Sequence, residues 1–119
     1  MPGGPLDGNA LGLAAAQASV SGERLPDLAE QGQTYLSSRL DEYRRRYEQA
    51  YTDGTQTVFF VEEGHWADIG TNIDLDPREW KALRRVHAEL LKRLGSDLDR
   101  RGEFEAALEV REAVVIGTA

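Results

Sequence analysis

Hydrophobic and polar residues follow a helical period over much of this chain. In residues 26–51 the apolar and aromatic side chains recur at spacings of three, four or seven: Leu28, Tyr35, Leu36, Leu40, Tyr43, Tyr47 and Tyr51. This spacing predicts one long helix that begins at Pro26, a residue suited to the first helical turn, and ends at TyrThrAspGly, residues 51–54. Gly32 would cost this helix about 1 kcal/mol relative to Ala, so a kink near Gly32 is an alternative.

A different pattern, TVFFV, fills residues 57–61, where consecutive β-branched and aromatic residues predict a buried strand. A single strand leaves its backbone groups without hydrogen-bond partners. The comparable run in this sequence is AlaValValIle, residues 113–116. The sequence therefore predicts that these two segments pair with each other, or that one of them pairs with a second copy of the chain.

The strongest helix-start signal lies at residues 75–80. Asp76 is the expected N-cap, Pro77 the first helical residue, and Glu79 the second member of a capping box, while Leu75 and Trp80 form a hydrophobic staple. The apolar stripe of this helix comprises Trp80, Leu83, His87, Leu90, Leu91 and Leu94, and Gly95 is expected to end the helix.

A last helix is expected to start at Ser96 or at Glu103. The run from Leu94 to Ala107 resembles a tetratricopeptide-type helical hairpin, in which a small residue, a turn glycine, an aromatic and an alanine stand at these relative positions. Arg111 replaces the aromatic residue that this pattern has next, and such repeats need about three copies to form a core. The resemblance therefore implies a helical hairpin and no more.

The N-terminal residues 1–8, MPGGPLDG, are rich in Gly and Pro and predict a disordered tail, followed by a short helix from Asn9 to about Val20. Residues 9–119 are expected to form a single small domain, because a chain of 119 residues suffices for one modest core. The expected fold class is α+β and predominantly helical, with four to five helices and a minimal two-stranded pairing.

The composition limits the kinds of site that the chain can form and the cellular location that is expected for it. The absence of cysteine excludes disulfides, thiolate zinc sites and cysteine nucleophiles. No window approaches the apolar length of a membrane span, and the N-terminus lacks the basic region of a signal peptide, so no membrane partner and a cytoplasmic location are expected. The formal net charge is −7, and Lys81 and Lys92 are the two lysines against twelve arginines.

An acidic, lysine-poor surface is typical of proteins adapted to high salt, although a GC-rich gene also favours arginine. From the strand VFFVEEGHW through the capped helix to EFEAALEVREAVVIG, the chain resembles small acidic uncharacterised proteins of halophilic archaea. This resemblance implies a cytoplasmic, salt-adapted protein, and it assigns neither an activity nor a site residue.

One cluster of chemically capable side chains follows the predicted strand, and it comprises Glu62, Glu63, His65 and Asp68. A metal-dependent enzyme around His65 is one hypothesis, but no HxxxH or HExxH spacing places ligands on one helical face. The simpler interpretation is a turn between a strand and a helix. His87 lies inside an apolar stripe and is expected to be neutral, packed and bonded to one partner. We therefore assign no catalytic residue and expect no cofactor.

The predicted helix 77–94 is basic on the side opposite its apolar stripe. Its candidate nucleic-acid-binding residues are Arg78, Lys81, Arg84, Arg85 and Lys92. With residues 65–75 as a first helix and turn, this pattern is compatible with a helix-turn-helix DNA-binding regulator. The acidic total and Glu89 within the basic side count against this alternative.

The leading hypothesis is a non-enzymatic protein-interaction or regulatory module that self-associates. Tyrosine offers a large ring with a polar tip and is favoured on half-buried surfaces. The candidate interaction residues are Tyr35, Tyr43, Tyr47 and Tyr51, which could equally line the core. A homo-oligomer formed through this tyrosine segment or through a strand edge is the specific expectation.

Overall fold

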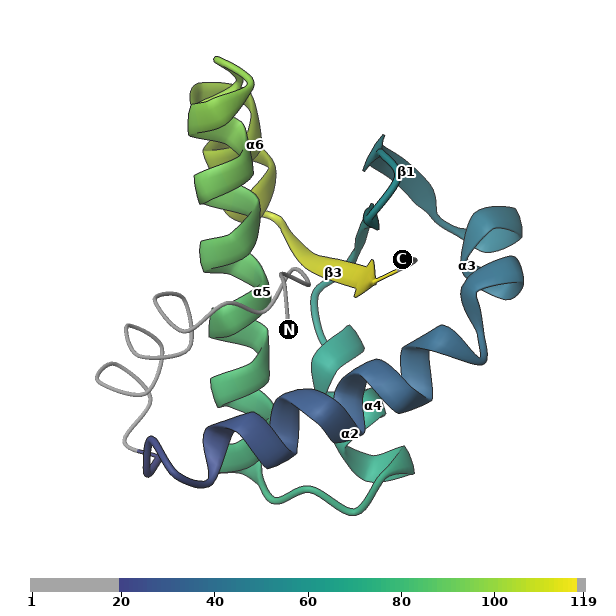
Figure 1. Ribbon diagram of the computed structural model, residues 1–119, viewed down its shortest axis with the longest axis vertical. Helices are drawn as coiled ribbons and strands as arrows, with labels where there is room; N and C mark the ends of the chain where they lie inside the picture. The colour runs from purple at the N-terminus through teal and green to yellow at the C-terminus, as the bar shows by residue number, and fades with distance from the viewer. Residues whose placement is uncertain (1–19, 118–119) are drawn as a thin grey trace.

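A computed structural model of the chain describes residues 20–117, which fold into five helices and three strands (Figure 1). In chain order these are α2 (Leu25–Ser37), α3 (Leu40–Arg46), β1 (Glu48–Thr52), β2 (Gln56–Glu62), α4 (His65–Asn72), α5 (Pro77–Asp97), α6 (Arg101–Leu108) and β3 (Arg111–Gly117). The fold is α+β and predominantly helical, which confirms the predicted class. The predicted tail 1–8 and the predicted helix that starts at Asn9 lie outside the described residues.

The strands form one antiparallel sheet in the order β1-β2-β3. Thr57 pairs with Ile116 and Phe59 pairs with Val114, so the predicted pairing of TVFFV with AlaValValIle is confirmed. The third strand, β1, was not predicted, and it pairs with the other side of β2 through a register shift between Gln49 and Tyr51.

Both faces of the sheet are covered, which explains why the β2 pattern does not alternate. Phe59 contacts Tyr43 of α3 on one face, with ring centroids 5.7 Å apart. Phe60, the next residue, points to the opposite face and contacts Phe104 of α6 at 6.1 Å. All five residues of TVFFV are consequently buried.

The prediction of one helix over residues 26–51 was wrong. The helix α2 stops at Ser37 because Ser38 and the guanidinium of Arg39 both bond the carbonyl oxygen of Tyr35, at 3.0 and 2.9 Å, and so cap the last turn. After the short helix α3 the chain enters β1. Residues 51–54, which were predicted to end the long helix, instead form the end of β1 and the start of the hairpin turn to β2. In that turn Asp53 Oδ1 accepts hydrogen bonds from the backbone N–H groups of Thr55 and Gln56.

The helix α2 continues through Gly32, which is buried there, and a Cβ at this position would lie 3.4 Å from Leu83 Cδ1. The absence of a side chain therefore lets α2 approach α5.

The start of α5 follows its sequence signal closely. Asp76 Oδ1 accepts from the backbone N–H of Glu79 at 3.0 Å, and Glu79 Oε1 accepts from the N–H of Asp76 at 2.9 Å, which completes the predicted capping box. The helix runs past Gly95 to Asp97. Gly95 instead permits close packing, because a Cβ there would lie 3.0 Å from both Phe104 Cδ2 and Arg101 Cα of α6.

The chain then folds back in the predicted helical hairpin of α5 and α6 (Figure 1). Arg111, which the hairpin pattern would place in a helix, begins β3 instead. In residues 20–117 no helix combines the length and the apolar character that crossing a membrane requires.

Candidate functional site

The turn between β2 and α4 is fixed by a buried carboxylate from β3. Glu112, with 7% of its surface exposed, accepts hydrogen bonds from the backbone N–H groups of Gly64 and Trp66, both at 2.9 Å. No side chain of its own segment caps α4, and Gly64 adopts φ 95°, a conformation that favours glycine. Glu112 therefore supplies the anionic partner that the positive N-terminal end of α4 needs.

His65, the first residue of α4, is held between two tyrosine rings. Its Nε2 lies 2.5 Å from the hydroxyl oxygen of Tyr43, and its ring meets those of Tyr43 and Tyr47 edge to face at 5.5 and 5.2 Å. Burial lowers the pKa of His65 below its ordinary value, although the carboxylates of Glu112 and Asp68 act in the opposite direction. Packing therefore accounts for this histidine.

The residues of the metal hypothesis do not share one site. Glu62, His65 and Asp68 line a shallow hollow of about 550 Å³ together with Tyr47 and Phe60. Glu63 lines a different hollow, described below. Within residues 20–117 no group of three or more His, Asp or Glu side chains is placed to hold a metal ion.

His87 confirms its expected role as a packed core residue. It is buried on α5, its ring lies 4.5 Å from that of Trp66, and its Nδ1 accepts a hydrogen bond from the backbone N–H of Val115 at 2.9 Å. Burial lowers its pKa to about 3, so the neutral ring carries its proton on Nε2 at neutral pH.

Three side chains, one of them His87, close the outer edge of β3 by bonding its backbone groups. The side-chain amide of Gln33 donates to the carbonyl of Val115 at 2.7 Å and accepts from the N–H of Gly117 at 2.9 Å. The indole of Trp66 donates to the carbonyl of Ala113 at 2.9 Å. With His87, these side chains occupy the positions that an additional strand would need, so this edge of the sheet is blocked.

The outer edge of β1 differs from that of β3, because no described side chain or strand pairs with its outward backbone groups. Because Val115 directs its backbone groups away from β2, the antiparallel alternation makes Val58 face β1 and Phe59 face β3. Gln49, opposite Phe59, therefore directs its N–H and C=O outward. Among the described residues no other segment pairs with this edge, and Glu48, Gln49 and Thr52 are exposed.

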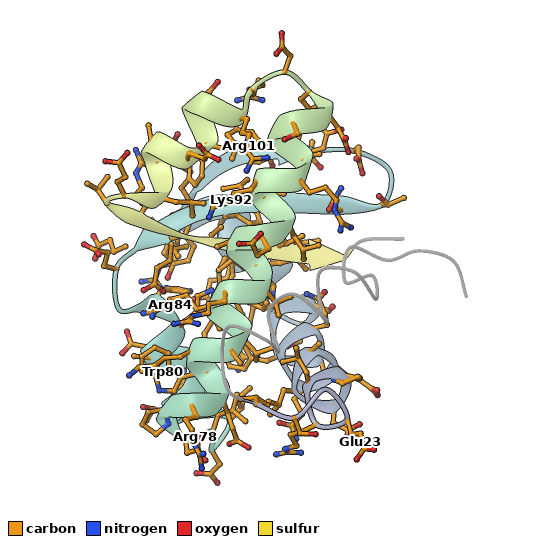
Figure 2. The ribbon with its side chains drawn as sticks, turned by 90° about the vertical axis from the view of Figure 1, so that its left-hand side faces the viewer. Glu23, Arg78, Trp80, Arg84, Lys92 and Arg101 are labelled. Carbon is orange, nitrogen blue, oxygen red and sulfur yellow. The ribbon has the colours of Figure 1, made fainter. Side chains whose placement is uncertain are left out.

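The basic residues of α5 divide into two groups. Arg78 and Lys81 are exposed in its first turns, and Lys81 lies 5.6 Å from the centre of the Trp80 ring. Farther along, Arg84 and Lys92 lie above one another on α5 (Figure 2) and contribute to a second hollow. This basic hollow measures about 380 Å³, and its lining includes Arg84, Arg85, Lys92, Arg111, Glu63 and Ala88.

The four tyrosines do not form one surface. Tyr35 belongs to α2 and stacks on the guanidinium of Arg39 at 3.8 Å, whereas Tyr43 is buried in the core from α3. Tyr47 caps α3, and Tyr51 lies in β1 with its hydroxyl donating to Asp53. The predicted tyrosine helix therefore does not exist, and a tyrosine interface cannot be built from it.

The fold and these sites define a small helix-dominated α+β domain in which the histidines and the buried glutamate have structural partners. The chain belongs to the family described as Domain of unknown function (DUF8048), whose model matches residues 4–118. Comparison with curated proteins and with solved structures found no match.

The sequence interpretation missed three important residues. Glu112 and Gln33 act on backbone groups that are 46 to 84 positions away in the chain, and no local pattern signals such contacts. Arg111 was considered only as an atypical helix residue, yet it bonds Glu48 of β1 and lines both hollows. The strand propensity of ValValIle directly after it was the available signal.

Proposed function

We propose that this protein is a non-enzymatic protein-interaction module that self-associates through the outer edge of β1. The observation that carries the proposal is the contrast between the two edges of the sheet. The side chains of Gln33, His87 and Trp66 satisfy the outward backbone groups of β3, while the outward groups of Gln49 in β1 have no partner among the described residues. An edge with unpaired N–H and C=O groups is a template for another strand.

A second copy of the chain fits this edge by charge. The exposed Arg45 precedes β1 and the exposed Asp53 follows it. If two β1 strands pair antiparallel about a twofold axis, each Arg45 approaches the Asp53 end of the other strand. Opposite charges then meet at both ends of the shared ladder, and the two sheets become one six-stranded sheet.

The surface composition predicts a modest, concentration-dependent affinity. Val110 is the one large hydrophobic residue that is exposed within residues 20–117, so no extended apolar patch there supports a permanent dimer. Backbone pairing and end charges would carry the association. A cytoplasmic, salt-adapted setting is part of the proposal, supported by the cysteine-free, acidic composition.

Light scattering coupled to size exclusion, over a dilution series, tests this proposal. We expect a dimer at high concentration that dissociates on dilution. Gln49→Pro removes an outward N–H and should give a monomer, whereas Gln49→Ala keeps that N–H and should still dimerise. Circular dichroism of both variants controls for folding. A wild-type protein that stays monomeric at millimolar concentration would contradict self-association, and equal dimerisation of both variants would contradict the role of β1.

A second candidate, a DNA-binding regulator, is supported by the order of α4, a short turn and α5. The two helices pack closely, since a Cβ on Gly70 of α4 would lie 2.4 Å from Trp80 Cδ1 of α5. Arg78, Lys81 and Arg85 are exposed on α5. Binding to duplex DNA should then fall steeply with salt and weaken in Arg78→Ala. No binding at low salt would eliminate this candidate.

A further inference from the structure

We propose that the basic hollow between α5 and the start of β3 binds an oxyanion of the phosphate class. Arg84, Arg85 and Lys92 reach it from α5, and Arg111, which also bonds Glu48 of β1, reaches it from β3. Four cationic side chains thus converge on one concave site in a chain whose formal net charge is −7. None of the residues that line this hollow belongs to β1, and the inference does not depend on self-association.

The hollow has a defined shape because its central lining residues are small. Ala88 lies one helical turn after Arg84 and one turn before Lys92, so it lies between the two cations on the surface of α5. Ala113 of β3 also lines the hollow. Side chains that end at Cβ leave a space of about 380 Å³, which accommodates a phosphate or a pyrophosphate group.

Two of these cations, Arg84 and Lys92, retain unused capacity to donate hydrogen bonds. Arg84 makes no hydrogen bond to another described residue, and its closest carboxylate oxygen, Oε2 of Glu112, is 3.9 Å away. The ammonium of Lys92 lies 3.6 Å from Glu89. Both distances exceed those of good charge-assisted hydrogen bonds, about 2.7–2.9 Å. By comparison, Arg101 bonds its carboxylate partner on α6 at 2.6 Å. An incoming oxyanion can therefore engage donors of Arg84 and Lys92 without breaking a strong bond.

Two carboxylates near the hollow act differently on an anion. Glu112 already accepts from the N–H groups of Gly64 and Trp66, so its charge is offset by the N-terminus of α4. Glu63 is exposed and also lines the hollow, and its negative charge opposes an anion there. Neutralising Glu63 should therefore strengthen binding, which gives the hypothesis a test with a definite sign.

Isothermal titration calorimetry of the full chain with pyrophosphate, and separately with inorganic phosphate, measures the binding. We expect saturable binding that weakens about tenfold in Arg84→Ala and in Lys92→Ala, as the loss of one charge-assisted contact implies. Glu63→Gln should bind more tightly. Lys81→Ala, which removes an exposed cation of the same helix outside the hollow, is the matched control and should bind within twofold of the wild type.

Ala88→Leu separates the hollow from charge in general, because it keeps every cation and fills the space. This variant should lose binding while circular dichroism and its unfolding temperature show that it is folded. A parallel titration with a short duplex DNA distinguishes a free phosphate ligand from a nucleic-acid backbone. DNA binding that is lost in Ala88→Leu would identify the backbone as the source of the phosphate.

Absence of binding by pyrophosphate, phosphate and DNA would overturn the proposal. Binding that survives Ala88→Leu but disappears in Lys81→Ala would also overturn it, because anion recognition would then belong to the exposed first turns of α5.

Discussion

Protonation of His87 should destabilise the fold as the pH falls below neutrality. The ring is buried on α5, its Nδ1 accepts from the N–H of Val115, and burial holds its pKa at about 3 against an ordinary 6.5. Because the folded pKa is lowered, the unfolded chain binds the proton more readily between these two values. The contribution of His87 to stability is complete above pH 6.5 and is lost as the pH falls toward 3.

The size of the effect follows from the two pKa values. A pH of 5 lies about 1.5 units below the ordinary histidine pKa of 6.5, so His87 is protonated in the unfolded chain. In the folded protein the ring remains neutral at this pH. At 1.36 kcal/mol per unit, the free energy of unfolding at pH 5 should be about 2 kcal/mol lower than at pH 7 because of this one group.

Urea unfolding at pH 7 and pH 5, followed by tryptophan fluorescence, measures this difference. His87→Gln removes the titration, so the variant should lose about 2 kcal/mol less than the wild type over this interval, even if it is less stable at both pH values. The partly exposed His65 provides the matched control, and His65→Gln should change the pH dependence less. Equal pH dependence in wild type and His87→Gln would refute the argument. If His87→Gln does not fold, an NMR titration of the wild-type imidazole decides, since a pKa above 5 would refute it equally.

Three further perturbations test the packing and electrostatics. Glu112→Gln should lower the free energy of unfolding by about 1–3 kcal/mol in chemical denaturation, because it weakens a buried acceptor of two backbone N–H groups. The control Glu63→Gln changes an exposed residue and should alter this free energy little, so similar losses in both variants would contradict the capping role of Glu112. Gly70→Ala should lower the free energy of unfolding by about 1–3 kcal/mol in thermal or urea unfolding, since the new Cβ meets the Trp80 ring. Gly102→Ala, which has open space around its Cβ, should be neutral or stabilising. If Gly70→Ala is as stable as the wild type, the contact between α4 and α5 is looser than described. Raising KCl should increase the unfolding temperature, because salt screens the self-repulsion of a chain with net charge −7, and a decrease would count against the salt-adapted interpretation.

Local signals predicted the elements whose structure is decided locally. The capping box of Asp76 and Glu79 formed as expected, because its partners are three residues apart. TVFFV and AlaValValIle were recognisable as a pair because both are apolar runs that need a buried neighbour. β1 was missed because Tyr47 and Tyr51 continue the spacing of a helix, and the strand GluGlnAlaTyrThr forms through its pairing with β2.

The candidate sites were predictable as residue types but not as arrangements. Glu62, His65 and Asp68 do share a hollow, yet Glu63, the residue directly after Glu62, lines another. Arg84 and Lys92 were predicted as candidate nucleic-acid-binding residues of one basic helix, and Arg111 joins them only because β3 returns beside α5. Such convergence depends on tertiary packing, which a single sequence does not display.

The side chains that look most able to do chemistry are used here to complete the backbone. A domain built from short helices and three short strands has many ends and edges, and each leaves N–H or C=O groups that must find a partner. Glu112 serves the start of α4, Arg39 the end of α2, and Gln33 with His87 the edge of β3. These side chains are therefore committed to stability. We propose that binding uses the places where such completion stops. One is the outer edge of β1, with which no other described segment pairs, and the other is the basic hollow, where Arg84 and Lys92 are only loosely paired.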